Sequence, residues 1–424
     1  MARTHRRLLT VVTVLSIAAT GVVAAPPSPA AGTDSIQLTS VSDAAATARL
    51  FSAGDTHSCA IRNGDVLCWG SNRRGEAGGP SFDSLVTSPV AVSGLGDAAA
   101  VSAGRQHTCA VRTTGAVVCW GDNRQEQLGV STDTTLRSRT PVAVPGVTGA
   151  TAIAAGYDHT CALLGSGSIR CWGRGSSGEL GHGSSPAAPS AAVTVQGITN
   201  ATAISAGRVH TCAVLADRTV RCWGSTMDGR LGNGVDDGSI ANTPQPVSGL
   251  TNVVGLAVGD EHSCALRSNG TIRCWGSQQG GRVGNDTFFG STSTPQPTDT
   301  AVSDFVHVTA GGSHSCATRS GGQLMCWGAN NRGTLGLPTT QTQYRVPTAV
   351  PGLPSVAAAA GGGSHTCVVT TARAVRCVGE NTEAQVTSGP LGITAAPAAV
   401  PGLADVVVVQ VAVGTDHACA LLVS

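Results

Sequence analysis

Residues 53–70 read A-G-D-T-H-S-C-A-I-R-N-G-D-V-L-C-W-G, and this stretch decides the fold because the chain repeats it. Related stretches occupy residues 103–121, 155–173, 206–224, 258–276, 310–328 and 361–379, and an eighth copy begins at Val413 and stops half-way, at Ser424. The repeated histidines follow one another at intervals of 50 to 52 residues. A fixed period of this length indicates an array of one supersecondary unit, stacked or closed into a ring.

Each copy predicts a β-hairpin. In the first copy Asn63-Gly64 is a strong signal for a two-residue type I′ turn, in which both residues need positive φ. Counting outward from this turn places Cys59 opposite Cys68 in a non-hydrogen-bonded pair. The later copies have one more loop residue, and such loops favour glycine in the left-handed region at their last position. Glycine occupies that position at residues 115, 167, 270 and 322, whereas Arg218 and Arg373 do not fit the preference.

Opposed cysteines in these hairpins lie within the range that a disulfide needs. The predicted bonds join Cys59 with Cys68, Cys109 with Cys119, Cys161 with Cys171, Cys212 with Cys222, Cys264 with Cys274, Cys316 with Cys326 and Cys367 with Cys377, which leaves Cys419 alone. Free thiols are one alternative, and a metal site built from His57, Cys59 and Cys68 is another. The metal alternative offers three ligands per copy, one fewer than a structural zinc site uses. We therefore favour disulfides and expect no metal and no cofactor.

The first 47 residues differ in composition from the repeats. Residues 1–31 resemble an export signal, with Arg3, Arg6 and Arg7 before an apolar run at 8–25 and small residues after it. An uncleaved membrane anchor is the alternative, because the apolar run is near the lower limit for a span. Residues 32–47 form a polar linker, and residues 48–424 form one domain with seven complete repeats and one partial C-terminal repeat. Export to an oxidising compartment also agrees with the predicted disulfides, so we expect a secreted or cell-surface bacterial protein.

Charge argues against nucleic acid as a partner. The chain has 26 basic residues, all of them arginine, against 25 acidic residues, and removal of residues 1–31 would take away three of the arginines. Nucleic-acid-binding domains usually show a basic excess or patch, which is missing here. We expect no membrane contact after cleavage of the signal, and we expect a monomer.

Four short strands are predicted in each repeat. In the second repeat they cover residues 98–103, 107–112, 116–122 and 141–144, separated by glycine, asparagine and proline. Short strands at regular spacing indicate an all-β fold, and four strands in each of seven repeats of about 51 residues match a seven-bladed β-propeller. Both faces of each hairpin are apolar, as expected for a blade packed between two others. A β-helix is the main alternative, but its repeats are much shorter.

The motifs also resemble a known family. Trp120-Gly121-Asp122-Asn123 with Leu128-Gly129, followed by Ala155-Gly156, His159 and Ala162-Leu163, is similar to the regulator of chromosome condensation repeat family. The resemblance covers about residues 48–424 and implies a seven-bladed propeller in which the repeated His and Trp are framework residues. Exported propellers similar to this family include a β-lactamase inhibitory protein. The seventh repeat departs from the pattern, because Val378 replaces the tryptophan.

The number of repeats leaves the closure of the ring open. The chain contains eight histidine strands but seven of the strands that end in Cys-Trp-Gly or Cys-Val-Gly. Strands from the two ends of the chain could pair in one blade, which completes seven blades with a half-unit to spare. Alternatively an eighth blade is truncated, and Cys419 then lacks its partner strand.

Positions that vary between repeats are better candidates for function than the repeated positions, because a partner recognises one particular surface. The dipeptide before each histidine varies, as do the segment after Trp-Gly and the long loops that follow. The candidate partner-binding residues are the aromatic side chains in these segments: Phe82, Tyr157, Phe288, Phe289 and Tyr344. Aromatic side chains in loops on a rigid scaffold are typical anchors for a protein partner, although they could also fold back over blade edges.

The sequence favours a secreted, non-enzymatic propeller that binds or inhibits another protein. No Ser/His/Asp or Cys/His arrangement stands apart from the repeat, and we expect no catalytic residue. A structural or adhesive domain of the cell surface is the alternative. Guanine nucleotide exchange, the best-known role of the family that the repeats resemble, and an enzyme acting on glycans are less favoured.

Overall fold

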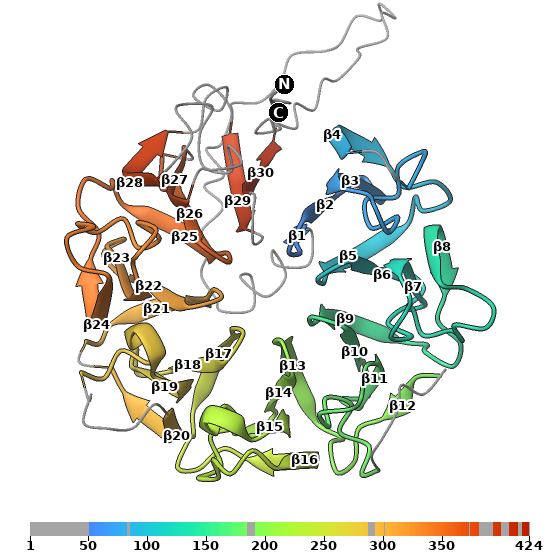
Figure 1. Cartoon of the computed structure of the whole chain (residues 1–424), viewed down its shortest axis with the longest axis horizontal. Helices are drawn as coiled ribbons and strands as arrows, with labels where there is room; N and C mark the ends of the chain where they lie inside the picture. The colour runs from blue at the N-terminus through green and yellow to red at the C-terminus, as the bar shows by residue number, and fades with distance from the viewer. Residues whose placement is uncertain are drawn as a thin grey trace, which may run out of the picture.

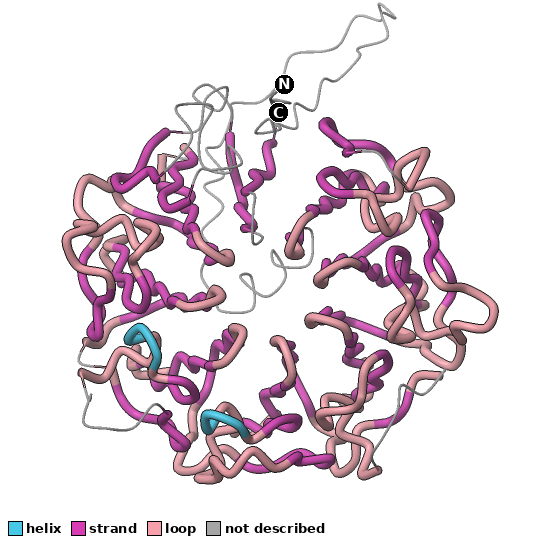
Figure 2. Tube along the Cα trace, in the orientation of Figure 1, coloured by secondary structure: helices cyan, strands magenta, loops and turns pink. Residues whose placement is uncertain are grey.

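The structure is a computed structural model, and it describes residues 51–82, 85–184, 191–286, 293–300, 302–372, 374–380, 393–399, 407–413 and 418–423. Within these residues the chain forms seven four-stranded antiparallel sheets arranged in a ring (Figure 1). The fold is therefore a seven-bladed β-propeller, which confirms the prediction from the repeats. Strands and loops make up almost all of the described residues, and two short 3-10 helices, Met227–Gly229 and Gln279–Gly281, interrupt them (Figure 2). The predicted signal and linker lie outside the described residues.

Each blade is built from four consecutive strands. Blades one to three comprise β1 (Phe51–Ala53), β2 (His57–Arg62), β3 (Asp65–Ser71), β4 (Leu85–Ala91); β5 (Ala98–Ala103), β6 (His107–Arg112), β7 (Val117–Asp122), β8 (Arg137–Ala143); and β9 (Ala150–Ala155), β10 (His159–Leu164), β11 (Ile169–Gly173), β12 (Val193–Thr194). Blades four and five comprise β13 (Ala201–Ala206), β14 (His210–Leu215), β15 (Val220–Ser225), η1 (Met227–Gly229), β16 (Ile240–Pro246); and β17 (Val253–Val258), β18 (His262–Arg267), β19 (Ile272–Ser277), η2 (Gln279–Gly281), β20 (Ser293–Asp299). Blades six and seven comprise β21 (Phe305–Ala310), β22 (His314–Arg319), β23 (Leu324–Ala329), β24 (Gln343–Ala349); and β25 (Val356–Gly361), β26 (His365–Thr370), β27 (Val375–Glu380), β28 (Ile393–Ala399).

The order of strands within a blade fixes which loops share a face of the ring. We name the strands of each blade A to D, from the central channel outward (Figure 1). In blade two, the end of strand A (Ala103) pairs beside the start of strand B (Thr108), and His107 at that start pairs with Gly121 near the end of strand C. The A–B turns and the C–D loops therefore emerge on one face, which we call the rim face. The B–C turns emerge on the opposite face, which we call the hairpin face.

The hairpin turns have the predicted conformations. Asn63 and Gly64 have φ of 52° and 90°, so both residues of the first turn are in the positive-φ region that a type I′ turn needs. Gly115 has φ of 79° at the last position of its three-residue loop. Arg218 occupies the same position in blade four and also adopts positive φ, 61°. The loop geometry is thus retained there in spite of the unfavourable residue, and Arg373 lies outside the described residues.

The fourth strand of a blade starts earlier than the sequence predicted. In blade two the prediction was residues 141–144, whereas β8 runs from Arg137 to Ala143. The pairing of β7 with β8 shifts register between Cys119 and Gly121, where Gly121 has φ of 107°. This irregularity lets residues before Pro141 join the sheet. Because β8 is the outer strand and half-exposed, its first residues carry no apolar periodicity that a sequence pattern could reveal.

All seven predicted disulfides are present, each between strands B and C of one blade. They join Cys59 with Cys68, Cys109 with Cys119, Cys161 with Cys171, Cys212 with Cys222, Cys264 with Cys274, Cys316 with Cys326 and Cys367 with Cys377. The two cysteines of each pair are direct cross-strand neighbours with Cα atoms 4.1 Å apart, and all of them are buried. The disulfides therefore belong to the core of each blade.

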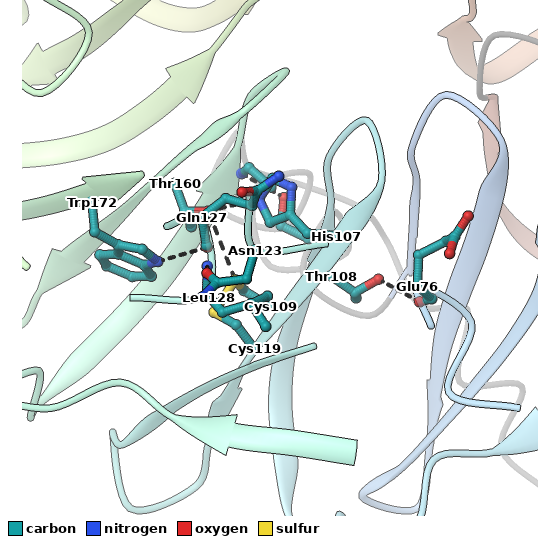
Figure 3. The surroundings of a disulfide bond; sticks show 12 residues. Glu76, His107, Thr108, Cys109, Cys119, Asn123, Gln127, Leu128, Thr160 and Trp172 are labelled. Carbon is teal, nitrogen blue, oxygen red and sulfur yellow. Dashed lines mark hydrogen bonds between the residues drawn. A yellow bond between two sulfur atoms is a disulfide. The ribbon is translucent and has the colours of Figure 1, made fainter. Parts of the chain in front are cut away.

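The repeated histidine and tryptophan join neighbouring blades. We call the interface between two consecutive blades a seam. In the seam between blades two and three, His107 Nε2 lies 2.8 Å from Thr160 Oγ1, and Trp172 Nε1 donates to the carbonyl oxygen of Gln127 at 3.0 Å (Figure 3). The Thr160 hydroxyl donates to the same carbonyl at 3.5 Å. Equivalent histidine contacts join His57 to Thr108, His159 to Thr211, His210 to Ser263, His262 to Ser315 and His314 to Thr366.

These contacts also fix the protonation of the seam histidines. The Thr160 hydroxyl gives its single proton to a carbonyl oxygen, so it can only accept from His107, and His107 Nε2 must carry a proton. Nδ1 of His107 is buried without a hydrogen-bond partner, which disfavours a second proton there. Burial lowers the pKa of His107 to about 3 and that of His159 to about 4. The seam histidines are therefore neutral at neutral pH, and their Nε2 atoms join neighbouring blades.

The ring contains one further sheet. Strands β29 (Val407–Val413) and β30 (Ala418–Val423) pair with each other, and β29 contacts β25 and β26 on one side and β1 on the other. This two-stranded sheet stands between the seventh and first blades (Figure 1). Within the described strands, no sheet combines strands from the two ends of the chain. Of the two predicted closures, the truncated extra unit is the one that matches this arrangement.

Candidate functional site

The variable dipeptides gather at the mouth of the central channel on the rim face. The A–B turns of the seven blades line a cavity of about 460 Å³ there. Its side chains include Asp55, Arg105, Tyr157, Arg208 and Asp260, each from a different blade. The variable dipeptides of different repeats thus meet at one end of the ring. We call this cavity and its lining the channel mouth.

Glycines bring the blades together at the channel mouth. In blades one to six, the glycine that opens the A–B turn packs against the carbonyl oxygen of the equivalent glycine in the next blade. A Cβ atom on Gly104 or Gly156 would lie 2.6 Å or less from the oxygen of Gly156 or Gly207, respectively. Only glycine permits this approach, because a real Cβ never comes so close to another backbone. The backbone of the A–B turns is therefore tightly packed from blade to blade, which fixes the positions from which the side chains of the channel mouth extend.

Three consecutive blades contribute a stack of charged and aromatic side chains. The Tyr157 ring of blade three has the guanidinium carbon of Arg105 4.4 Å from its centroid and that of Arg208 5.4 Å from it. Both distances fall within the range of cation–π attraction. The stack orders long side chains that remain accessible, since the side chain of Arg105 is 38% exposed and that of Arg208 is 49% exposed.

Acidic side chains surround this stack at longer distances. Arg105 Nη1 lies 3.9 Å from Asp158 Oδ1, and Arg208 Nη1 lies 3.9 Å from Glu261 Oε1. Glu261 is closer to Arg282, whose Nη1 donates to Glu261 Oε2 at 3.1 Å. Burial raises the pKa of Asp158, and Arg105 opposes this shift. Burial also raises the pKa of Asp260, with Arg208 opposing. The arginines of the mouth thus offset only part of the effect of burial on the pKa values of its carboxylates.

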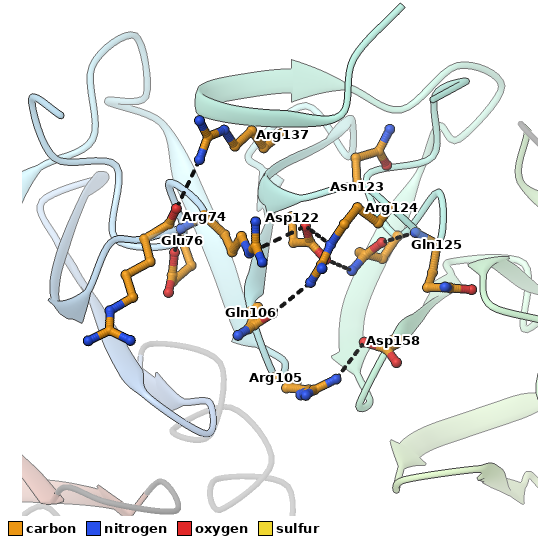
Figure 4. Close-up of polar contacts among 12 residues, drawn as sticks. Arg74, Glu76, Arg105, Gln106, Asp122, Asn123, Arg124, Gln125, Arg137 and Asp158 are labelled. Carbon is orange, nitrogen blue, oxygen red and sulfur yellow. Dashed lines mark hydrogen bonds and ion pairs between the residues drawn. The ribbon is translucent and has the colours of Figure 1, made fainter. Parts of the chain in front are cut away.

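A second cluster supports the mouth from the C–D loop of blade two. Asp122 is buried, and its carboxylate accepts hydrogen bonds from Arg124 Nε at 2.9 Å and from Gln127 Nε2 at 3.1 Å (Figure 4). Arg124 also donates to Gln106, the neighbour of Arg105, at 3.3 Å. Arg74 of blade one reaches the same carboxylate at 4.0 Å. This network ties the C–D loops of two blades to the A–B turn that carries Arg105.

The opposite side of the mouth is formed by small residues. Blade six contributes Gly312 and Ser313, and blade seven contributes Gly363 and Ser364. The Gly312 amide donates to the carbonyl oxygen of Gly362 at 3.1 Å, so this part of the lining is held by backbone contacts. The channel mouth is therefore asymmetric, with large charged side chains over blades two to five and none over blades six and seven.

The three predicted aromatic residues that the structure describes do not form one site. Tyr157 lies in the channel mouth. Phe82 is half-buried against the next blade, with Arg137 4.0 Å and Arg139 5.1 Å from its ring. Tyr344, predicted to lie in a loop, lies instead in β24, and its hydroxyl donates to the carbonyl oxygen of Pro338 in the preceding loop at 3.1 Å. Phe288 and Phe289 lie outside the described residues, so their candidacy stays a prediction.

Arg105 and Arg208 were not singled out from the sequence. They belong to the variable dipeptides, and the signal that could have found them is their position in the repeat, since both immediately follow the opening glycine, as Tyr157 does. Three histidines lie outside the repeated positions, namely His5, His182 and His307. His307 lies in β21, and burial lowers its pKa. Its Nδ1 has no hydrogen-bond partner, which agrees with a packed residue.

Among the residues that the structure describes, no group of three or more histidine, cysteine, aspartate or glutamate side chains could hold a metal ion. Within the same residues, no helix has the length and apolar character needed to span a membrane.

Comparison with known proteins shows a family relationship. Sequence patterns described as "Regulator of chromosome condensation (RCC1) repeat" match residues 49–76, 98–127, 150–179, 201–228, 253–282 and 305–334, and a second pattern of the same description matches 63–111, 114–163, 219–266 and 321–369. Together these matches cover well over half of the chain.

Similar proteins include the ultraviolet-B receptor UVR8 of Arabidopsis thaliana, 32% identical over 278 residues that make up 63% of this chain and 62% of that protein. The human E3 ubiquitin-protein ligase HERC2 is 32% identical over 248 residues, 57% of this chain but 5% of that protein. The chain thus spans less than two thirds of the length of these relatives.

Two solved structures have the same fold. Prp20p from Saccharomyces cerevisiae superposes with a TM-score of 0.70 at 19% identity, over 87% of this chain and 94% of that chain. Human WBSCR16 superposes with a TM-score of 0.72 at 19% identity, over 85% of this chain and 100% of that chain. At these identities the likeness concerns the fold alone. With the repeats matched along its length, the chain belongs to the regulator of chromosome condensation (RCC1) repeat family.

Proposed function

We propose that this chain is an exported, non-enzymatic propeller that binds another protein through its rim face. The observation that carries the proposal is the separation of repeated from variable residues. The repeated His, Thr or Ser, Trp and Cys side chains are buried in blades and seams. The residues that differ between blades, including Arg105, Tyr157 and Arg208, stand together at the channel mouth. A surface that differs from blade to blade on a rigid ring is suited to recognising one partner.

Export and the absence of catalysis remain parts of the proposal. Seven disulfides support export, because such bonds persist in oxidising compartments. For the structurally similar Prp20p, binding to Gsp1p and histones has been described. The partner of the present chain has to be found by experiment.

A photo-crosslinking experiment tests the proposal. The chain contains no lysine, so amine-reactive reagents would miss its surface. We would instead place a photoreactive amino acid at Ser313 on the rim face and, as the matched control, at Asn269 in the B–C turn of blade five. Both variants would be expressed in the native host and irradiated in the culture.

A defined protein adduct from position 313 and none from position 269 is the expected result. Mass spectrometry of the same material should show a chain that begins after the predicted signal. Adducts from position 269 alone, or none from either position, would contradict binding through the rim face. A retained N-terminus would contradict export.

A further inference from the structure

We propose that the channel mouth binds an extended segment of the partner through one aspartate or glutamate side chain of that segment, held between Arg105 and Arg208 beside Tyr157. This inference rests on the proposed function and adds the chemistry of the contact. It concerns the stack over blades two to four, which lies within the channel mouth.

The first support is the unused hydrogen-bonding capacity of the two arginines. A guanidinium has five N–H donors. Within the described residues, neither Arg105 nor Arg208 donates a side-chain hydrogen bond to the protein, and the nearest carboxylate oxygen of each lies 3.9 Å away. That distance is too long for a hydrogen bond. Tyr157 therefore positions both arginine side chains, but their N–H groups still lack hydrogen-bond acceptors among the described residues.

The second support is preorganisation. The Tyr157 ring lies within 4.4 Å of one guanidinium carbon and 5.4 Å of the other, which restricts the rotamers of both arginines before any partner arrives. Ordering of long side chains is one of the main costs of association, and a stack that is already ordered reduces it. Arginine and tyrosine are also among the residues that dominate binding energy at protein interfaces.

The third support is the distribution of negative charge, which limits the ligand to a single carboxylate. Asp55 lines the mouth on the blade-one side of Arg105, and Asp260 lines it on the blade-five side of Arg208. A polyanion lying across the mouth would meet these two carboxylates as well as Asp158 and Glu261, whereas one carboxylate between the arginines would lie away from Asp55 and Asp260 and compete only with the long 3.9 Å contacts that Asp158 and Glu261 make to the arginines. The flanking aspartates thus favour a partner segment whose acidic residue has neutral or basic neighbours.

The fourth support is the open side of the mouth. Gly312 and Gly363 place no side chain there, and Ser313 and Ser364 place small ones. Among the described residues, this side of the mouth therefore offers more room for a polypeptide backbone that approaches the stack than the side lined by arginine and tyrosine. The cavity volume of about 460 Å³ accommodates a few residues of an extended chain and lies in the usual range for ligand sites.

Peptide selection followed by a double-mutant cycle tests the inference. A random dodecapeptide display library would be selected on the disulfide-intact mature protein. The best peptide would then be synthesised with its acidic residue and with the isosteric amide, Asn for Asp or Gln for Glu. Each peptide would be titrated against the unmodified protein, the double variant that combines Arg105→Gln with Arg208→Gln, and the Arg73→Gln control, which removes an exposed arginine from the rim-face loop of blade one.

The expected result is enrichment of peptides with one acidic residue between non-acidic neighbours. The amide peptide should bind the unmodified protein at least ten-fold more weakly, and the double arginine variant should lose a similar factor for the acidic peptide. The two losses should not add when combined, since they remove the same contact. Arg73→Gln should leave binding within two-fold.

Four outcomes would overturn the inference: enriched peptides without an acidic residue, equal binding of acid and amide, an equal effect of Arg73→Gln, and failure to enrich any peptide that depends on the two arginines. A penta-aspartate peptide that binds better than a peptide with one aspartate would also contradict it. In all these cases a partner adduct from position 313 would leave the proposed function standing, so the two failures are distinguishable.

Discussion

The seams and the channel mouth are built from the same repeats but follow opposite rules. In the seams, blade after blade places the same histidine, hydroxyl, carbonyl and tryptophan in the same contacts, as His107, Thr160, Gln127 and Trp172 do. At the mouth, equivalent positions hold Arg105, Tyr157, Arg208, Asp260 and Gly312 in consecutive blades. The comparison indicates that the repeated residues hold the ring together, while recognition depends on the positions that were free to differ.

The largest expected effect is a loss of stability at low pH, which acts on the histidines of the seams. Burial lowers the folded-state pKa of His107 and His314 to about 3 and that of His159 to about 4, from 6.5. The unfolded chain therefore binds more protons than the folded chain between these values. The stabilisation is complete above pH 6.5 and is lost as the pH falls toward 4. Each of these histidines can cost up to about 1.4 kcal/mol per pH unit in that window.

Denaturant unfolding at pH 7 and pH 5 measures this effect. We expect the free energy of unfolding to fall by several kcal/mol, partly offset by Glu179, Asp158 and Asp260, whose pKa values burial raises. A His159→Gln variant keeps an N–H donor but cannot titrate, so its loss between the two pH values should be smaller than that of the unmodified protein. Equal stability at pH 7 and pH 5 would contradict neutral histidines in the seams.

Removal of one seam tryptophan should have the next largest effect. Trp223 is fully buried, and its Nε1 donates to the carbonyl oxygen of Glu179 at 2.7 Å. Trp223→Val would leave a cavity and remove one of the two hydrogen bonds that the Glu179 carbonyl accepts, while the bond from the Thr211 hydroxyl at 3.2 Å would remain. We expect a loss of about 3–5 kcal/mol, most of it from the cavity. Differential scanning calorimetry would show the loss as a lower unfolding temperature. A change of less than about 1 kcal/mol would mean that the neighbouring blades repack to fill the cavity, and that the seam is less rigidly packed than its contacts indicate.

The seventh blade offers the reverse experiment. Val378 stands at the tryptophan position, and a Cβ on Gly336 would lie 3.4 Å from it, whereas the same atom on Gly181 would lie 2.8 Å from Trp223. Because Gly336 is retained, Val378→Trp should fit the seam and restore an N–H donor toward the Thr334 carbonyl. We expect a gain of about 1 kcal/mol, measured by calorimetry beside Trp223→Val. A loss of stability would show that this seam has repacked around valine.

The smallest effect on stability is expected at the mouth. Arg208 is exposed and makes one long ion pair, so Arg208→Gln should change the free energy of unfolding by less than about 0.5 kcal/mol. The same variant should lose partner crosslinking from position 313. If it instead unfolds as readily as Trp223→Val, the mouth shares the structural role of the seams, and the distinction between the two regions fails.

The sequence predicted the repeated parts of the molecule because they are local. The pairing of Cys59 with Cys68 depends only on the Asn63-Gly64 turn and on counting along two strands. The start of β8 at Arg137 was missed, since an outer strand at a register shift leaves no apolar pattern. The stack of Arg105, Tyr157 and Arg208 could not be predicted either, because these residues come from three repeats and meet only when the ring has formed.

The ring of glycines has a consequence for protein engineering. In blades one to six, the A–B turn is anchored by a glycine that packs against its neighbour's backbone, as Gly104 does against Gly156, and this contact involves no atom of the two side chains that follow. Those side chains can therefore be exchanged between blades, or randomised, without altering the frame that carries them. The protein is in this sense a ready-made display scaffold, on which new binding specificities could be selected by varying the dipeptides before the histidines.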